Sequence, residues 1–163
     1  MIYIISIISL ILDGVISNFI SFSNYSNTYF RTFFSLMSLI IIYYFYKRDF
    51  LKFILISFII GMVYDMLYSN TFIINAVLFS IVAMLIYAIH KAISYNLISV
   101  IISGILSIII SGIYNYLILL FMKGYKVADL FTYIKSNIIF NVVYILVLYL
   151  IVKRVSSKHK FSY

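Results

Sequence analysis

The side chains able to do acid, base or metal chemistry are few in this chain. Its 163 residues include four Asp and two His, but no Cys and no Glu. Two of the acids, Asp13 and Asp65, stand inside long apolar runs, and Tyr64-Asp65 resembles one half of an aspartyl protease motif. The other half, Gly-x-Gly-Asp, is absent, since Asp13 directly follows Leu12. No phosphate-binding loop, zinc-protease motif or nucleophile elbow is present, so the sequence predicts no enzyme, no metal site and no cofactor.

Six long apolar runs hold these acids and determine the class of the protein. Hydrophobic residues make up 66% of the chain and charged residues 10%, and the mean hydropathy is +1.17. A soluble domain is about 45–50% apolar, whereas about 20 apolar residues cross a bilayer core. The sequence predicts an all-α integral membrane protein, with one six-helix transmembrane domain at residues 1–152 and a basic cytoplasmic tail at 153–163. The expected helices are Ile2–Phe22, Phe30–Tyr46, Phe53–Tyr68, Phe72–Ile89, Leu97–Met122 and Ile134–Val152.

The basic residues orient these helices. In a soluble protein a net charge of +8 could indicate nucleic-acid binding, but cations that flank membrane helices set topology instead, and we expect no nucleic-acid partner. If all six helices cross the bilayer, eight of the 12 Lys and Arg residues fall on the side of the two termini. The positive-inside rule then places both termini in the cytoplasm. The helices pair as three tandem hairpins, the middle one closed by a very short link near Ser69.

Small polar residues recur every four positions on the first, third and fifth helices. Residues four apart share a helix face, and small side chains let a neighbouring helix approach closely. We therefore interpret the stripes as packing faces within the chain; docking of a partner's membrane helix, above all on the fifth helix, is the alternative. The three stripes are Ser9, Asp13, Ser17 and Ser21; Ser57, Gly61, Asp65 and Ser69; and Ser99, Ser103, Ser107, Ser111 and Asn115.

Asp65 lies near the outer end of the third helix, with Asn75 at a similar depth across the short link. We predict a hydrogen bond between these two side chains, with Arg31 in reach of the same layer. Such a group is a structural clamp, or else a substrate or proton site. If it is a clamp, the substitution Asp65→Asn should have only a mild effect. Asp13 lies deeper, and its partner cannot be predicted from the sequence.

The segment Lys123–Ser136 is the longest of the expected outer links. Its apolar residues stand at helical spacing, which predicts a short helix in the outer interface that serves as an anchor or as a protein-docking surface. The tail after Val152 carries several cations, which an anionic leaflet attracts; contact with a cytoplasmic partner is the alternative. The apolar residues of the link are Val127, Leu130, Phe131 and Ile134.

The middle hairpin resembles a known family. Gly61-Met62-Val63-Tyr64-Asp65-Met66-Leu67, followed by Asn75-Ala76, is similar to the signature of the bacterial rod shape-determining protein MreD family. That signature typically reads Gly-x-x-x-Asp-Leu-Leu, a short turn, and Gly-Leu-His/Asn-Ala. Thr71 and Ile73 stand where the turn usually has Pro and Gly, which leaves its geometry open. The chain length, the six expected helices and the basic C-terminal tail agree with the family across nearly the whole chain.

The resemblance implies a non-enzymatic scaffold of the cell-elongation complex in the bacterial cytoplasmic membrane. It implies a role in cell shape and lateral peptidoglycan synthesis through binding MreC. MreB and the elongation transpeptidase–glycosyltransferase pair are the further partners that it suggests. The family fold is also similar to the S components of energy-coupling-factor transporters, so a vitamin-binding S component is the alternative function. S components usually carry an Ala-x-x-x-Ala motif on the first helix, where this chain has no Ala.

Overall fold

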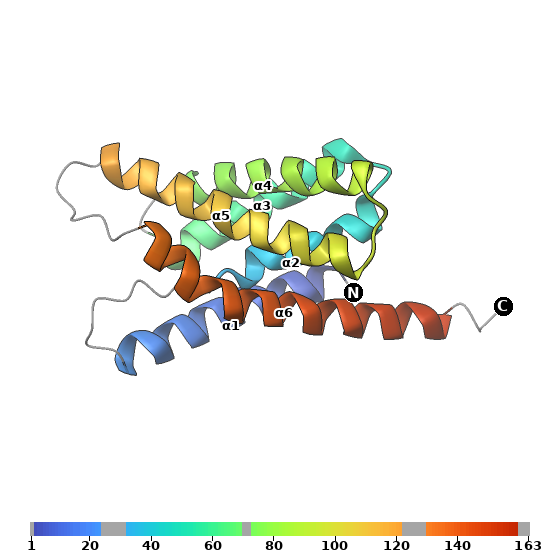
Figure 1. Cartoon of the computed structure of the whole chain (residues 1–163), viewed down its shortest axis with the longest axis horizontal. Helices are drawn as coiled ribbons and strands as arrows, with labels where there is room; N and C mark the ends of the chain where they lie inside the picture. The colour runs from blue at the N-terminus through green and yellow to red at the C-terminus, as the bar shows by residue number, and fades with distance from the viewer. Residues whose placement is uncertain (1, 24–31, 70–72, 122–129, 160–163) are drawn as a thin grey trace.

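The computed structural model describes residues 2–23, 32–69, 73–121 and 130–159. These residues form six α-helices and no strand (Figure 1), which confirms the predicted all-α class. The helices are α1 (Ile2–Ser23), α2 (Phe34–Tyr46), α3 (Phe50–Tyr68), α4 (Ile74–Ala92), α5 (Leu97–Phe121) and α6 (Leu130–His159).

Two helices differ clearly from their predicted bounds. The second was expected from Phe30, but Thr32 and Phe33 are not helical and α2 begins at Phe34. The sixth was expected at Ile134–Val152, yet α6 extends beyond both of these bounds. Residues 153–159 contain no Gly or Pro to end a helix, so the first part of the predicted tail continues α6. Within the predicted interfacial link, residues 130–136 belong to α6, and 123–129 lie outside the described residues.

Four of the described helical stretches are long and apolar enough to cross a membrane. Helix α2 has only 13 residues, or about 20 Å at the usual rise per residue, against a bilayer core of about 30 Å. Among the described residues, the helix lengths therefore give four candidate spans and do not confirm the six that the sequence predicts. The four stretches are Phe50–Tyr68, Ile74–Ala92, Leu97–Ile118 and Asn137–Arg154.

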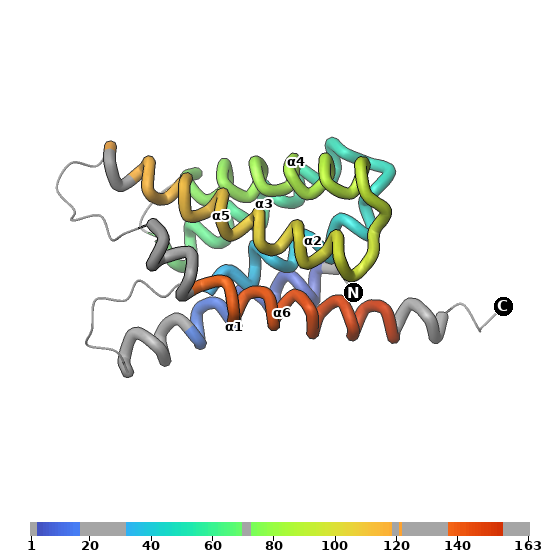
Figure 2. The backbone as a smooth tube through the Cα atoms, in the orientation of Figure 1, coloured from blue at the N-terminus to red at the C-terminus, as the bar shows by residue number. Residues whose placement is uncertain are grey.

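The short helix α2 forms the centre of the bundle. It packs against all five other helices, and every residue from Phe34 to Tyr43 is buried. The helices lie roughly along one common axis (Figure 2). Around α2, neighbouring contacts join α1 to α3, α3 to α4, α4 to α5 and α5 to α6. Non-helical backbone at membrane depth is tolerated where protein buries it, which fits Thr32 and Phe33, exposed by 1% and 0%.

Successive helices alternate in direction. The start of α1, the end of α6 and the α2–α3 and α4–α5 links lie at one end of the bundle (Figure 1). This end is called the terminal end below. Lys47, Arg48 and Lys52 belong to the α2–α3 region, Lys91 to the end of α4, and Lys153 to the last part of α6.

The turn before α4 keeps an unusual backbone conformation. Ile73 has φ 78° and ψ −16°, in the left-handed region. A side chain branched at Cβ clashes with the backbone there, at a cost of about 1–3 kcal/mol. Ile73 stands where the signature described above usually has Gly, the residue that adopts this conformation without strain. Of the turn whose geometry the sequence left open, the structure describes only Ser69 and Ile73, and Ile73 is left-handed without being the Gly that suits this conformation.

Candidate functional site: two buried carboxylates at helix N-termini

The first buried carboxylate, Asp65, lies on the last turn of α3 beside the first turn of α4. Its Oδ2 accepts the backbone N–H groups of Asn75 at 2.9 Å and Ala76 at 3.2 Å. Its Oδ1 accepts the Asn75 side-chain amide at 2.7 Å and the Ser69 hydroxyl at 2.5 Å. The hydrogen bond expected between Asp65 and Asn75 is therefore present. Arg31, expected in the same layer, lies outside the described residues.

This contact satisfies the N-terminus of α4. The first N–H groups of a helix have no acceptor within the helix, and the helix dipole makes this end positive. The N-cap residue, Ile73, makes no side-chain cap, because its side chain has no polar atom. Asp65 supplies the missing acceptor from the neighbouring helix, and it does so while only 1% exposed.

Gly61 allows the two helices to approach closely enough for this contact. A Cβ atom at Gly61 would lie 2.6 Å from the Cα of Ala76 and 2.8 Å from the carbonyl oxygen of Asn75. Gly61 and Asp65 are four residues apart and so share one face of α3. The residues that carry the family resemblance, Gly61, Asp65, Asn75 and Ala76, thus meet at a single crossing of α3 and α4.

The second buried carboxylate, Asp13, does for α2 what Asp65 does for α4. Its Oδ1 accepts the Phe34 N–H at 2.7 Å, and its Oδ2 accepts the Ser35 N–H at 2.8 Å and the Ser35 hydroxyl at 2.5 Å. Asp13 is 2% exposed. It makes no ion pair with a Lys or Arg of the described residues. The partner that the sequence could not identify is therefore the backbone at the start of α2.

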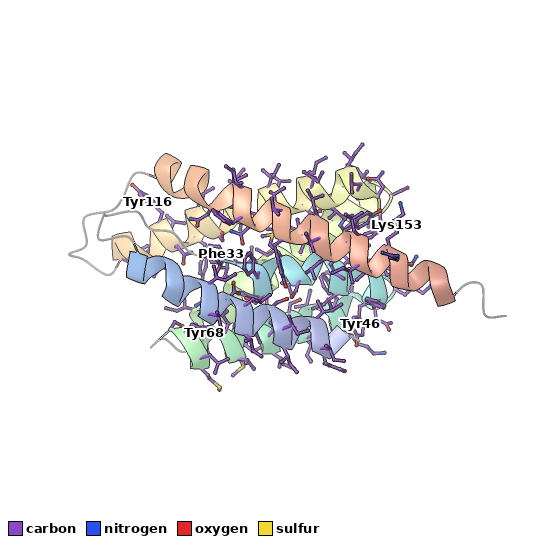
Figure 3. All side chains as sticks on the ribbon, turned by 90° about the horizontal axis from the view of Figure 1, so that it is seen from below. Phe33, Tyr46, Tyr68, Tyr116 and Lys153 are labelled. Carbon is purple, nitrogen blue, oxygen red and sulfur yellow. The ribbon has the colours of Figure 1, made fainter. Side chains whose placement is uncertain are left out.

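A third helix completes the same N-terminus. The Phe33 N–H donates to Oδ1 of Asn141 on α6 at 2.8 Å, and the Thr32 hydroxyl donates to the backbone carbonyl of Asp13 at 3.3 Å. Figure 3 shows Phe33 in the middle of the bundle, between α1 and α6. The start of α2 is thus held from both sides, by Asp13 and by Asn141.

The sequence interpretation missed the part played by α6. Asn141 donates to the carbonyl of Asn137 one turn earlier at 2.8 Å, and both residues are fully buried. The Tyr144 hydroxyl lies 2.7 Å from the Ser9 hydroxyl of α1. Asn137 and Asn141 stand four residues apart in an apolar helix. This is the same spacing of polar residues that marked the other stripes, and it could have identified α6 as well.

The stripe on α5 is covered by the chain's own helices. Ser103, Ser107 and Ser111 are fully buried, and their hydroxyls donate to carbonyls of α5 itself at 2.6–2.8 Å. Asn115 is half-buried, and its side-chain Nδ2 is buried without a partner. The serines therefore act by being small beside α2, α4 and α6, and a partner helix would have to displace these helices to reach them.

The arrangement is suited to holding helices together rather than to chemistry. A general acid or base must reach the proton that it moves, whereas the oxygens of Asp13 and Asp65 are buried and accept helix N–H groups. No three His or Asp side chains of the described residues gather where they could hold a metal ion. The two carboxylates are best understood as clamps that join α1 to α2 and α3 to α4.

We predict that Gly61→Ala destabilises the protein, because the added methyl group meets the backbone of Ala76. Overpacking of this kind costs about 1–3 kcal/mol, more than the ~1 kcal/mol that Ala gains over Gly in a helix. The matched control is Gly104→Ala, whose Cβ would meet nothing closer than 3.5 Å. Thermal unfolding in detergent should show a lower Tm for Gly61→Ala alone, and equal Tm values would contradict the close crossing.

We also predict that Asp65→Asn is more harmful than the mild effect expected from the sequence. Both carboxylate oxygens accept hydrogen bonds, so an amide NH2 at either position faces a donor. Each unsatisfied buried group costs about 1–3 kcal/mol. Asp65→Leu should lower the membrane abundance and the Tm of the protein still further. Asp49→Asn is the control, because Asp49 forms only an exposed pair with Lys52 at 3.2 Å and such pairs contribute little. Normal stability of Asp65→Leu would rule out the clamp.

A family model described as rod shape-determining protein MreD matches residues 1–158 of the 163-residue chain. The chain matches no curated protein and no solved structure.

Proposed function

Because the chain belongs to the rod shape-determining protein MreD family, we propose that it is a non-enzymatic membrane scaffold of the bacterial cell-elongation complex. Family membership gives it a role in rod shape determination. The same membership, with the four candidate spans, makes it a multi-pass membrane protein. The family is a shape-determining one and not a known enzyme family.

The observation that carries the scaffold proposal is the use of the two membrane acids as helix caps. An ionisable residue inside a membrane is costly and by default suggests a functional site. Here Asp13 and Asp65 accept backbone N–H groups of α2 and α4. The two acids thus join helices of the chain to one another, which supports a role as a scaffold.

We propose that all six helices cross the bacterial cytoplasmic membrane, as three tandem hairpins with both termini in the cytoplasm. The arrangement would be similar to the S-component fold. The excess of Lys and Arg on the side of the two termini supports this orientation. The buried segment Thr32–Phe33 lengthens the path of the short α2 toward the end of the bundle opposite the terminal end. We expect single Cys residues at Ser69 and Ser157 to react with an impermeant maleimide from opposite sides. The chain has no native Cys to interfere, and labelling from one side only would exclude this topology.

The proposed partner is MreC, and through it MreB and the elongation transpeptidase–glycosyltransferase pair. The proposed process is lateral peptidoglycan synthesis. The described helices offer wide apolar faces on α1, α3 and α6, where a partner's membrane helix has access from the lipid.

One observation weighs against the vitamin-binding alternative. Helix N-termini inside transporters bind the anionic groups of substrates. In this chain the N-terminus of α2 already holds the carboxylate of Asp13, and that of α4 holds Asp65. Both positions are filled from within, so the scaffold is the better-supported function.

Depletion of the protein from a rod-shaped host should give widened, rounded cells. The protein should also co-purify with MreC in mild detergent. Expression of the Asp49→Asn variant in the depleted cells should restore the rod shape, because Asp49 is exposed and lies outside both clamps. Cells that stay rod-shaped but lose vitamin uptake would contradict the scaffold and favour the transporter.

A further inference from the structure

The terminal end of the bundle carries uncompensated positive charge. Lys47, Arg48, Lys91 and Lys153 are exposed there, on three different helices or their ends. Figure 3 shows Tyr46 and Lys153 toward this same end. Its only described acid, Asp49, is paired with Lys52 at 3.2 Å. This exposed positive charge is complementary to an anionic partner.

Aromatic rings connect these cations across the end. The ammonium of Lys47 lies 5.9 Å from the ring centre of Tyr44, and Tyr44 is 5.2 Å from Tyr95 between ring centres. Tyr95 is 6.0 Å from Tyr149 on α6, one helical turn before Lys153. The ring of Tyr95 thus links elements that carry two of the cations.

Two buried polar atoms beneath this surface have no partner. They are the hydroxyl of Tyr95 and Nδ1 of His90, and their rings lie 5.0 Å apart between centres. His90 is 8% exposed. An unpaired buried polar group is costly, so both atoms indicate a ligand that supplies the missing hydrogen bonds.

The hydrogen bonds of Ser103 indicate which kind of partner Nδ1 of His90 lacks. The Ser103 hydroxyl donates its one proton to the Ser99 carbonyl at 2.7 Å. The 3.3 Å contact with Nε2 of His90 therefore requires an N–H at Nε2, which leaves neutral Nδ1 as a bare acceptor. Burial, with Tyr149 and Tyr44 nearby, raises the pKa of Tyr95 above its usual range, so its hydroxyl stays protonated and donates. The ligand must offer an acceptor to Tyr95 and a hydrogen-bond donor to His90.

We propose that the terminal end binds the phosphoglycerol headgroup of an anionic phospholipid, such as phosphatidylglycerol. Lys47, Lys91 and Lys153 hold the phosphate, Tyr95 donates to a phosphate oxygen, and Nδ1 of His90 accepts from a glycerol hydroxyl. Tyr95 is the one half-buried residue of a link whose neighbours Ile93, Ser94 and Asn96 are exposed. Rotation of this single side chain brings its hydroxyl to the headgroup. The inference rests on the proposed topology, which places this end at the cytoplasmic leaflet.

Native mass spectrometry of the delipidated full chain in detergent tests the site. Phosphatidylglycerol should bind more tightly than phosphatidylmethanol, which is anionic but has no donor for Nδ1 of His90, and phosphatidylcholine should bind least. Each cation contributes about fivefold, so Lys47→Gln, Lys91→Gln and Lys153→Gln together should weaken binding roughly a hundredfold. Lys123→Gln, Lys126→Gln and Lys135→Gln remove the same charge from the other side of the proposed topology and should change binding by less than about twofold.

Tyr95→Phe keeps the ring and removes only the hydroxyl that donates to the phosphate, so it should weaken the binding of both anionic lipids alike without changing Tm. Equal binding of all three lipids, or an equal loss in the control triple variant, would overturn the proposal. Binding of free glycerol 3-phosphate but not of the lipid would assign the site to a soluble ligand. Binding of polyglutamate in place of the lipid would assign the surface to an acidic protein. These measurements are made without MreC, so their failure leaves the scaffold proposal untouched.

Discussion

The structure depends on one constraint: a helix that starts inside a membrane bundle must find acceptors for its first N–H groups without water. Lipid offers none. The chain meets this requirement with a carboxylate from the preceding helix, Asp13 for α2 and Asp65 for α4. Each acid is placed where the helix dipole is positive, so the cost of burying it is offset by the hydrogen bonds that it completes. The same contact joins two consecutive helices, and capping and helix pairing become one interaction.

The rest of the bundle follows from where these caps stand. Asp13 and Asn141 fix the start of α2 inside the protein, which makes α2 short and leaves it enclosed by the other five helices. The small residues of α5 then allow α2, α4 and α6 to lie close to it, and Gly61 allows α3 to approach α4. The polar residues are thus placed at helix crossings, and the apolar ones fill the centre and face the lipid.

The sequence predicts the middle hairpin well because its partners are close along the chain. Asp65 and Asn75 are ten residues apart, so the short link alone brings them together. The N-terminus of α2 is different, since Phe33 and its acceptor Asn141 are 108 residues apart and no local pattern pairs them. The helix class follows from hydropathy, but the length of α2 does not, because its start is set by caps from α1 and α6. The left-handed turn at Ile73 also escapes prediction, since Ile does not favour that backbone conformation.

The shared cap on α2 also has a consequence for the order in which the protein can be assembled. Asp13 is available as soon as α1 has been made, and α3 and α4 can close their own clamp. The bond from the Phe33 N–H to Asn141, however, cannot form until the last helix has been made. The central helix therefore cannot reach its final state during synthesis of the first five. A chain that is cut short before α6 lacks this bond and all the packing of α6 against the central helix.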